Sequence, residues 1–399
     1  MEIRPILSTL LRNRVGATLI ALQIALTMAV IINSVFIILD RAETMRKPIG
    51  IAPEHLVTVS VADVADDADL ASVVSQDKLR LAELDGVIGA TKMSTMPLSN
   101  SGSNSGYRNG PDKNDATYIS IAYYQAGYDA LDVLGLNVTR GRWFTDDEIR
   151  YDPPDGESPK VAVIADATAI ALFGDEDPIG RYFYTSTDDA IEVIGTIEMM
   201  SRPWYNWGDF YVTMLVPVVQ RNNQWVVRVA PEQRESLLEP IAESLRKASL
   251  DRLVGTPRTY DEIIARTYQR DVAMNRMLTV VMTLVVAITA LGIVGLASFS
   301  VMQRRRQVGT RRAVGARRFH ILRYFLVENW LITTGGIVLG LALSFGINHL
   351  LVTEYEMPKL DPVYLPSVVL GLWALGLLAA LGPARNAMGV DPAIATRNI

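Results

Sequence analysis

Arginines are the residues whose number and spacing point most clearly to a binding function. Eight of them fall in residues 303–323, QRRRQVGTRRAVGARRFHILR, which contain no aspartate or glutamate. Guanidinium groups are permanently charged donors, so the chemistry of such a cluster is the binding of anionic partners. Attraction to anionic lipid alone would explain the charge. However, Gly309 and Gly315 divide the stretch and apolar residues separate the arginine pairs of RRAVGARR, which favours a short turn-helix with one docking face.

Motifs for catalysis are missing from the rest of the sequence. There is no GxxxxGK[ST] phosphate loop, no HExxH pair and no GxSxG nucleophile elbow. The sequence has no cysteine, and its three histidines (His55, His320 and His349) are far apart. Paired acids at 66–67, 146–147 and 188–189 fit solvated loop charge better than a cation site, which needs several converging oxygens. We therefore expect a non-enzymatic chain with no cofactor or metal of its own.

Membrane-length apolar runs flank the arginine cluster, in a chain of 399 residues with mean hydropathy +0.20. An apolar run of about 20 residues is long enough to cross a bilayer. We predict four spans, at 15–39, 277–302, 324–352 and 363–381. An amphipathic helix at 1–14 precedes them, and a tail at 382–399 follows them. A signal peptide is the alternative for the first run, but the run is too long and no small-residue cleavage site follows it.

Charge is distributed unevenly between the predicted sides of the membrane. Residues 40–276 contain 37 acidic and 24 basic residues, whereas residues 1–14, 303–323 and 385–399 together contain 13 arginines and two acids. Short loops on the cytoplasmic side of a membrane are enriched in Lys and Arg. This pattern predicts an inner-membrane protein of bacteria with both termini and the 303–323 loop in the cytoplasm, and with 40–276 outside.

The outside region reads as an α+β domain with an inserted β-rich lobe at 97–221. A strand at 55–61, a helix around 75–84 and a strand at 87–93 form one β-α-β half, within 51–96. A strand at 224–230 and an amphipathic helix at 231–249 repeat the pattern within 222–260. Within the lobe, apolar strand-like runs occur at 118–122, 161–164, 190–197 and 210–216. A charged stalk helix at 260–276, with Ile263, Ile264, Tyr268 and Val272 at helical spacing, leads without a breaker into the second span.

Several residues within the predicted spans invite a functional interpretation. Glu328 lies near the start of the third span, where an acid is a functional candidate, although pairing with a nearby arginine is at least as good an explanation. Gln23, Thr27 and Asn33 are expected to face other helices. The glycines of 334–346 are expected to serve helix packing rather than ligand binding.

Separated motifs give the chain a resemblance to a known family. QRRRQVGTRRAVGARRFHILRYFLVEN (303–329) and PARNAMGVDPAIATR (383–397) resemble the FtsX/MacB-type permease domain of ABC transporters. LNVTRGRWFTDDE (136–148), KVAVIADATAIALFGDEDPIGRYF (160–183) and IEVIGTI (191–197) are similar to the periplasmic core of MacB-like proteins. The family often has an acidic residue where Gln307 or Val308 stands. MacB also carries its ATPase on the same chain, whereas residue 1 here is next to the first span.

The resemblance implies a dimeric, type VII ABC permease that receives force from a separate cytoplasmic ATPase, which binds ATP and Mg²⁺. It implies a second permease, identical or paralogous, and a periplasmic adaptor with an outer-membrane TolC-like channel, and it gives no role to nucleic acid. Candidate coupling residues fall in 303–323: Arg304, Arg305, Arg306, Arg311, Arg312, Gly315, Arg317 and Arg318. Candidate transmission residues are Glu328 and the stalk residues Ile263, Tyr268 and Val272.

Three functions remain open from the sequence. The first is efflux or secretion of a periplasmic substrate, which the size of the outside region favours. The second keeps the same mechanics but serves lipoprotein extraction or a cell-wall hydrolase, as in FtsX-type proteins. The third is a membrane-bound sensor without transport.

Overall fold

The structure, a computed structural model, describes residues 14–63, 69–114, 116–154, 157–249, 252–355 and 362–389. It divides into two compact units: Arg46–Arg270, and Met1–Met45 together with Asp271–Ile399. The first unit is mixed α/β and the second has four helices that could cross a membrane, which confirms the predicted fold class. Apart from Arg14, the predicted amphipathic helix at 1–14 lies outside the described residues, as do residues 390–399 at the end of the tail and residues 356–361 between the third and fourth predicted spans.

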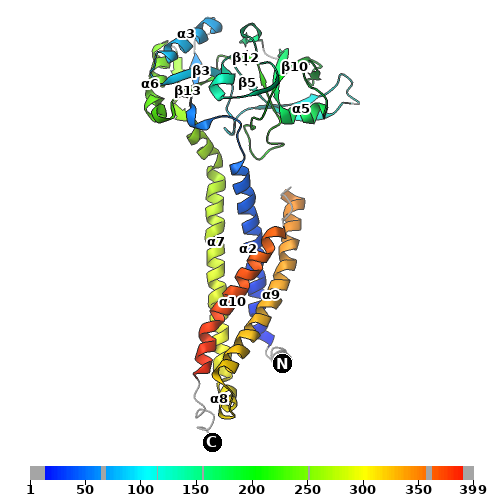
Figure 1. The fold of residues 1–399 in the computed structure, drawn as a ribbon, viewed down its shortest axis with the longest axis vertical. Helices are drawn as coiled ribbons and strands as arrows, with labels where there is room; N and C mark the ends of the chain where they lie inside the picture. The colour runs from blue at the N-terminus through cyan, green and yellow to red at the C-terminus, as the bar shows by residue number, and fades with distance from the viewer. Residues whose placement is uncertain are drawn as a thin grey trace. The chain divides into compact units, whose positions relative to one another are not determined.

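A four-stranded antiparallel sheet lies towards one end of the Arg46–Arg270 unit, in the order β15-β1-β13-β3 (Figure 1). Its strands come from both ends of the unit: β1 (Leu56–Val59), β3 (Val87–Met93), β13 (Gln224–Val229) and β15 (Arg258–Thr259). Helices α3 (Leu70–Ala82) and α6 (Arg234–Lys247) pack against each other and against this sheet. Beside it, β2 (Val61–Asp63) pairs with β14 (Arg252–Val254). The sheet therefore combines the two predicted β-α-β halves.

Most of the local predictions for this sheet are confirmed. Strands form within 55–61, at 87–93 and within 224–230, and α6 buries Leu237, Ile241 and Leu245 as its apolar spacing predicted. The helix predicted around 75–84 begins earlier in the sequence than expected, because α3 starts at Leu70. Asp69 caps it, since its carboxylate accepts a hydrogen bond from the Ser72 amide at 3.2 Å. Apolar spacing alone missed this cap.

The inserted lobe is built on a seven-stranded mixed sheet, in the order β6-β10-β8-β11-β5-β4-β9. Because β9 also pairs with the first residues of β10, six of the strands form a closed ring, and β6 pairs with the last residues of β10. The strands are β4 (Ser103–Arg108), β5 (Tyr118–Gln125), β6 (Val138–Gly141), β8 (Val161–Ala165), β9 (Tyr182–Tyr184), β10 (Ala190–Ile197) and β11 (Thr213–Val216). All four predicted runs contain strands, although β11 begins three residues later than the run at 210–216.

Short elements complete the lobe, and the sequence pattern did not predict its helices. α4 (Ala130–Leu134) packs on β3 and β13, and α5 (Asp166–Phe173) follows β8 directly. β7 (Arg150–Tyr151) pairs with β12 (Val218–Val219). Single 3-10 turns lie at Pro53–His55, Asp146–Glu148, Pro231–Gln233 and, after the third span, Pro362–Tyr364. An eight-residue helix such as α5 contains too few turns to give a clear periodic signal.

Arg108 closes the ring of strands between β4 and β9. Its side chain is 1% exposed, forms an ion pair with Asp188 and donates to the Thr185 carbonyl at 2.6 Å. The guanidinium also lies 5.4 Å from the centre of the Tyr184 ring. A buried arginine needs such partners, because an unpaired buried charge is strongly destabilising.

Glu148 should make the stability of this unit dependent on acid pH. Arg142 binds its carboxylate through two hydrogen bonds of 2.8 and 2.6 Å, and this pairing together with the Thr145 amide lowers the pKa of Glu148 to about 2. A depressed folded pKa stabilises the fold above the unfolded value of 4.5, and the benefit is lost as pH falls towards 2. E148Q should therefore lower the unfolding free energy by about 1 kcal/mol at pH 7, allowing for the half-exposed Arg142.

Thermal or denaturant unfolding of wild type and E148Q between pH 7 and pH 2 measures this effect. The difference between the two proteins should be constant above pH 5 and should shrink as the pH falls. E239Q is the control, because Glu239 is 69% exposed and contacts Arg246 only at 3.4 Å. A difference that stays constant down to pH 2 would contradict the assignment.

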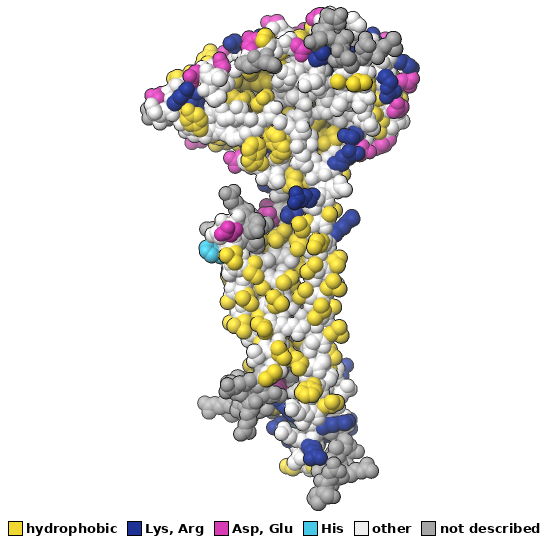
Figure 2. Space-filling model, turned by 180° about the vertical axis from the view of Figure 1, so that it is seen from behind, with side chains coloured by type: hydrophobic (Ala, Val, Ile, Leu, Met, Phe, Trp, Pro, Cys, Tyr) yellow, Lys and Arg dark blue, Asp and Glu magenta, His cyan; other side chains and the backbone are white. Residues whose placement is uncertain are grey.

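Most of four long helices belongs to the second unit: α2 (Arg14–Arg46), α7 (Tyr260–Gln303), whose part before Asp271 belongs to the first unit, α9 (Arg318–Tyr355) and α10 (Leu365–Met388). Each is long and apolar enough to cross a membrane. Figure 2 shows hydrophobic side chains spread over the outer surface of these helices. α2, α7 and α9 extend beyond the predicted spans at both ends, whereas α10 begins two residues inside the predicted 363–381 and continues past its end. The predicted continuity of the stalk at 260–276 with the second span is confirmed, since α7 is one unbroken helix.

Glycines allow α9 to approach α2 closely. A Cβ added to Gly336 would lie 2.8 Å from the Ala21 carbonyl oxygen, and one added to Gly340 would lie 2.7 Å from the Met28 Cβ. The packing role predicted for the glycines of 334–346 is thus confirmed for these two. Gly335 and Gly346 face open space on the same helix.

Polar side chains connect α2 with α7, as expected for polar residues in spans. The Thr27 and Thr289 hydroxyls lie 2.6 Å apart in the interior, and the Gln23 amide donates to the Ile288 carbonyl at 3.1 Å. Asn33 is buried and donates to Ala29 of its own helix. Towards the other end of the same two helices, Arg41 forms an ion pair with Asp271 at 2.6 Å. The two helices are therefore tied at two levels.

Candidate coupling site

The arginine-rich stretch folds as a short helix and a turn, not as an open loop. α7 ends at Gln303, α8 spans Arg305–Ala313, and α9 begins at Arg318. The 303–323 "loop" is therefore mostly helical, and the turn-helix interpretation is confirmed. The only non-helical residues within 305–323 are 314–317.

Gly315 ends α8 through a Schellman motif. Its φ is +101°, its amide bonds to the Arg312 carbonyl at 3.1 Å, and the next amide, of Ala316, bonds to the Arg311 carbonyl at 3.0 Å. This pair of bonds, with a glycine in the left-handed region, is a common way to end a helix. The glycine therefore sets the direction in which the chain leaves α8 and enters α9.

Replacing Gly315 by alanine should strain this turn. No atom obstructs a Cβ at this position, so the penalty comes from φ alone and should be about 1 kcal/mol. We expect G315A to lower the thermal unfolding temperature by a few degrees. G295A is the matched control, because Gly295 lies within α7 with open space around it and should tolerate alanine. Equal unfolding temperatures for wild type and G315A would contradict the motif.

A small apolar cluster holds α8 against the ends of the long helices. Val308 and Gly309 are the buried residues of α8. Val308 packs in a cluster contributed by α7, α9 and α10: Val301, Ile321, Phe325, Ala384 and Ala387. Residues at positions 301, 308 and 321 are close in space because the chain turns twice here. The cluster orients α8, so that its opposite side faces outwards.

The predicted coupling arginines divide into two groups. Three are tied to the helix bundle: Arg304 bonds to Glu328 at 2.8 Å, Arg311 lies 5.1 Å from the Tyr324 ring centre, and Arg312 donates to the Met388 carbonyl at 3.2 Å. The others are exposed and have no bonding partner among the described residues: Arg305, Arg306, Arg317 and Arg318. The second group is available to a partner, whereas the first maintains the shape of the site.

A hollow of about 600 Å³ lies between α8, the turn and the start of α9. Its floor includes Val308, Ile321 and Phe325, and its rim includes Arg311 and His320. Val314 and Phe319, 84% and 66% exposed, are the bulky apolar residues on and beside the turn. An apolar floor with a charged rim is typical of a surface that receives another protein. The spacing of RRAVGARR indicated Val314, whereas nothing in the sequence indicated the hollow.

The stalk residues do not act as one stripe. Ile263 packs on the core of the Arg46–Arg270 unit, and Tyr268 is buried there with its ring 4.9 Å from that of Tyr205. Val272 belongs to the other unit and is 39% exposed. Their common role in transmission therefore stays a prediction.

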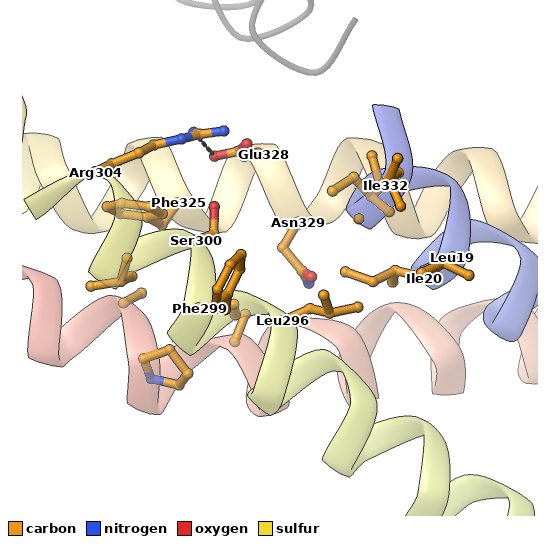
Figure 3. Close-up of a pocket in the computed structure, with 18 residues that line it drawn as sticks. Leu19, Ile20, Leu296, Phe299, Ser300, Arg304, Phe325, Glu328, Asn329 and Ile332 are labelled. Carbon is orange, nitrogen blue, oxygen red and sulfur yellow. Dashed lines mark hydrogen bonds and ion pairs between the residues drawn. The ribbon is translucent and has the colours of Figure 1, made fainter. Parts of the chain in front are cut away.

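Glu328 forms an ion pair with Arg304, which agrees with the second of the two interpretations of this residue, pairing with a nearby arginine. Its side chain is 8% exposed and that of Arg304 is 11% exposed. The pair borders a cavity of about 240 Å³ between α2, α7, α9 and α10, which Figure 3 shows. Nearby, the Asn329 amide donates to the Gly376 carbonyl of α10 at 2.8 Å.

Comparisons with known proteins agree with this architecture. Residues 17–244 match the MacB-like periplasmic core domain and residues 279–392 match the FtsX-like permease C-terminal domain. The chain is 27% identical over 286 residues to the macrolide export ATP-binding/permease protein MacB of Chromobacterium violaceum, covering 69% of this chain and 43% of that one. It is 24% identical over 314 residues to the protein of the same name from Neisseria meningitidis serogroup A, covering 75% and 46%. The chain thus spans less than half the length of these relatives.

Two solved structures show a limited likeness to this chain. The periplasmic region of MacB from Actinobacillus actinomycetemcomitans matches with a TM-score of 0.34 and 18% identity, covering 55% of this chain and 95% of that one. The extracellular domain of the ABC-type transporter YknZ from Gram-positive bacteria matches with a TM-score of 0.32 and 19% identity, covering 50% and 99%.

Proposed function

Because the chain belongs to the family of ABC transporter permeases with a MacB-like periplasmic core and an FtsX-like permease domain, we propose that it couples an ABC ATPase to work done by its periplasmic domain. The observation that carries this proposal is the surface formed by α8, the Gly315 turn and the start of α9. It offers four exposed arginines without partners among the described residues, two exposed apolar residues and a hollow. We assign it to the cytoplasmic side.

ATP and Mg²⁺ are bound, in this proposal, by an ATPase outside these 399 residues. The sequence contains no phosphate loop, and its relatives are named as ATP-binding/permease proteins. Closure of the ATPase around ATP would push on α8. The apolar cluster around Val308 and Phe325 connects α8 to α7, α9 and α10, so a movement of α8 reaches all three helices.

Transmission to the other side would use α2 and α7. Their contacts at Thr27–Thr289 and at Arg41–Asp271 hold them together at two levels, so they can move as a pair. α7 is unbroken from Tyr260 to Gln303, and an unbroken helix transmits displacement along its axis. The spans contain few ionisable groups, which argues against a polar conduit through the bundle. The permease would work as a dimer with itself or a paralogue.

We propose export of a substrate from the periplasm as the work done, through a periplasmic adaptor and an outer-membrane TolC-like channel. The match to the MacB-like periplasmic core favours this client over a lipoprotein or a cell-wall hydrolase.

The test is co-expression with each candidate ABC ATPase of the same genome, followed by purification and measurement of ATP turnover in lipid nanodiscs. We expect a stable complex whose ATP turnover rises when the adaptor is added. If a cell-wall hydrolase or a lipoprotein acceptor raises ATP turnover and the adaptor does not, the proposal of export is wrong and that alternative function replaces it. Failure of any ATPase to associate would overturn the coupling role and favour a sensor.

A further inference from the structure

We propose that the cavity beside the Arg304–Glu328 pair is a binding site for one phospholipid, which enters from the surrounding bilayer and completes the packing of the helix bundle. This site shares Arg304 and Phe325 with the hollow beside α8, but lipid binding to it can be measured without the ATPase and does not depend on the coupling role. The cavity holds about 240 Å³ between four helices. Cavities of about 150 Å³ with apolar walls already admit a benzene ring. Protein interiors rarely keep voids of this size, because the lining atoms lose their contacts.

The cavity is reachable from the side of the bundle. Three of its lining residues are exposed on the outer surface: Val15 at 74% and Leu19 at 55% on α2, and Phe299 at 57% on α7. Both helices are candidate membrane spans. In a membrane, this opening faces the hydrocarbon of the bilayer, so the molecules at highest concentration beside it are lipid chains.

The lining changes from polar to apolar along the helices, as a phospholipid does. Figure 3 shows Arg304 and Glu328 at one end and Leu19, Ile20 and Ile332 at the other. Arg304 follows the last residue of α7, and Leu296 lies eight residues before it, which is about 12 Å along a helix. Half of the hydrocarbon layer is about 15 Å thick. The polar end therefore lies at the depth of a headgroup and the apolar end at the depth of an acyl chain.

Arg304 has donors left for a phosphate. Its Nη1 bonds to the Glu328 carboxylate at 2.8 Å and to the Tyr324 hydroxyl at 3.4 Å. No residue in the described part of the chain accepts a bond from its Nε or Nη2. The two following residues, Arg305 and Arg306, are exposed at the same end. Juxtamembrane arginines attract anionic lipid, so a phospholipid with a net negative headgroup is the best match.

The test fills the cavity and counts bound lipid. The full chain is delipidated in detergent, titrated with dimyristoyl phosphatidylglycerol and analysed by native mass spectrometry. Wild type should bind one lipid per chain more tightly than all others. A297F, which places a ring in the cavity, should weaken that binding at least about tenfold by displacing buried methylenes. A287F is the matched control, because Ala287 is an exposed residue of the same helix outside the cavity.

S300F provides a second filling variant if A297F does not fold, since Ser300 also lines the cavity. Equal lipid binding by wild type, A297F and S300F would overturn the proposal, and so would an equal loss in A287F. The headgroup contact is tested with dimyristoylglycerol, which has the same chains without the phosphate. Wild type should prefer phosphatidylglycerol several-fold, and R304Q/E328Q should lose that preference. Absence of a preference in wild type would overturn the assignment of the phosphate to Arg304.

Discussion

Reversing the charge of Arg317 and Arg318 should abolish productive association with the ATPase. Both side chains are exposed at the start of α9 and have no partner among the described residues, so R317E/R318E removes no contact that the structure describes. An acidic partner surface would then meet two negative charges. Like charges placed together at an interface cost several kcal/mol, so we expect at least about thirtyfold weaker binding. ATP turnover of the purified complex should fall to that of the ATPase alone.

The control for this variant carries the same change of charge elsewhere. Arg266 and Arg270 are exposed arginines near the start of α7. They belong to the Arg46–Arg270 unit, whereas α8 belongs to the other unit. R266E/R270E should leave association and turnover at wild-type levels. Raising the salt concentration should weaken the wild-type complex, because exposed charges are screened. If R317E/R318E still co-purifies with a coupled ATPase, the docking surface is wrong. Arg312 is a poorer target, since its bond to the Met388 carbonyl would confuse docking with stability.

Replacing Gly340 by leucine should prevent the helix bundle from assembling. The new Cβ would lie 2.7 Å from the Met28 Cβ, 2.9 Å from the Ala25 carbonyl oxygen and 3.1 Å from the Ala25 Cα. These atoms belong to the backbone or are the first side-chain carbon, so no rotamer change relieves the clash. Overpacking costs about 1–3 kcal/mol even where side chains can adjust. Here α9 must move away from α2, and most of the protein should be lost to aggregation.

G346L is the matched control, because Gly346 lies on the same helix with no atom near the position that its Cβ would take. Size-exclusion chromatography in detergent and thermal unfolding measure both variants. G346L should elute and unfold like wild type, whereas G340L should elute in the void volume or unfold many degrees earlier. Normal behaviour of G340L would show that α2 and α9 do not pack as described.

The sequence could predict elements that depend on local pattern. Alternation of β-branched residues located β1, β3 and β13, and the length of apolar runs located the four spans. The turn at Gly315 also had a local signal, since glycine followed a helical segment. The N-cap at Asp69 had a local signal too, because aspartate is a favoured N-cap residue, but the predicted helix at 75–84 did not include it. All of these features, including the cap that was not predicted, depend on residues within a few positions of each other in the sequence.

The roles of several side chains depend on contacts with residues far away in the sequence, and the local sequence pattern does not show such contacts. The arginines of 303–323 are chemically identical, yet Arg304 meets Glu328 24 residues later and Arg312 meets Met388 76 residues later. Only these distant partners separate the structural arginines from the available ones. Likewise, Tyr268 contacts the ring of Tyr205, 63 residues earlier in the sequence, and the lipid cavity exists only where four helices meet.

The order of strands in the four-stranded sheet has a consequence for folding during synthesis of the chain. Thr58 of β1 pairs with Val226 of β13, so β1 waits for 168 further residues before its partner exists. At a synthesis rate of about 5–20 residues per second, that delay is roughly 10–30 s. The ring of strands at 103–216 is complete within this interval and can fold first. During this interval β1 is an unpaired apolar strand, so its aggregation competes with folding until β13 emerges.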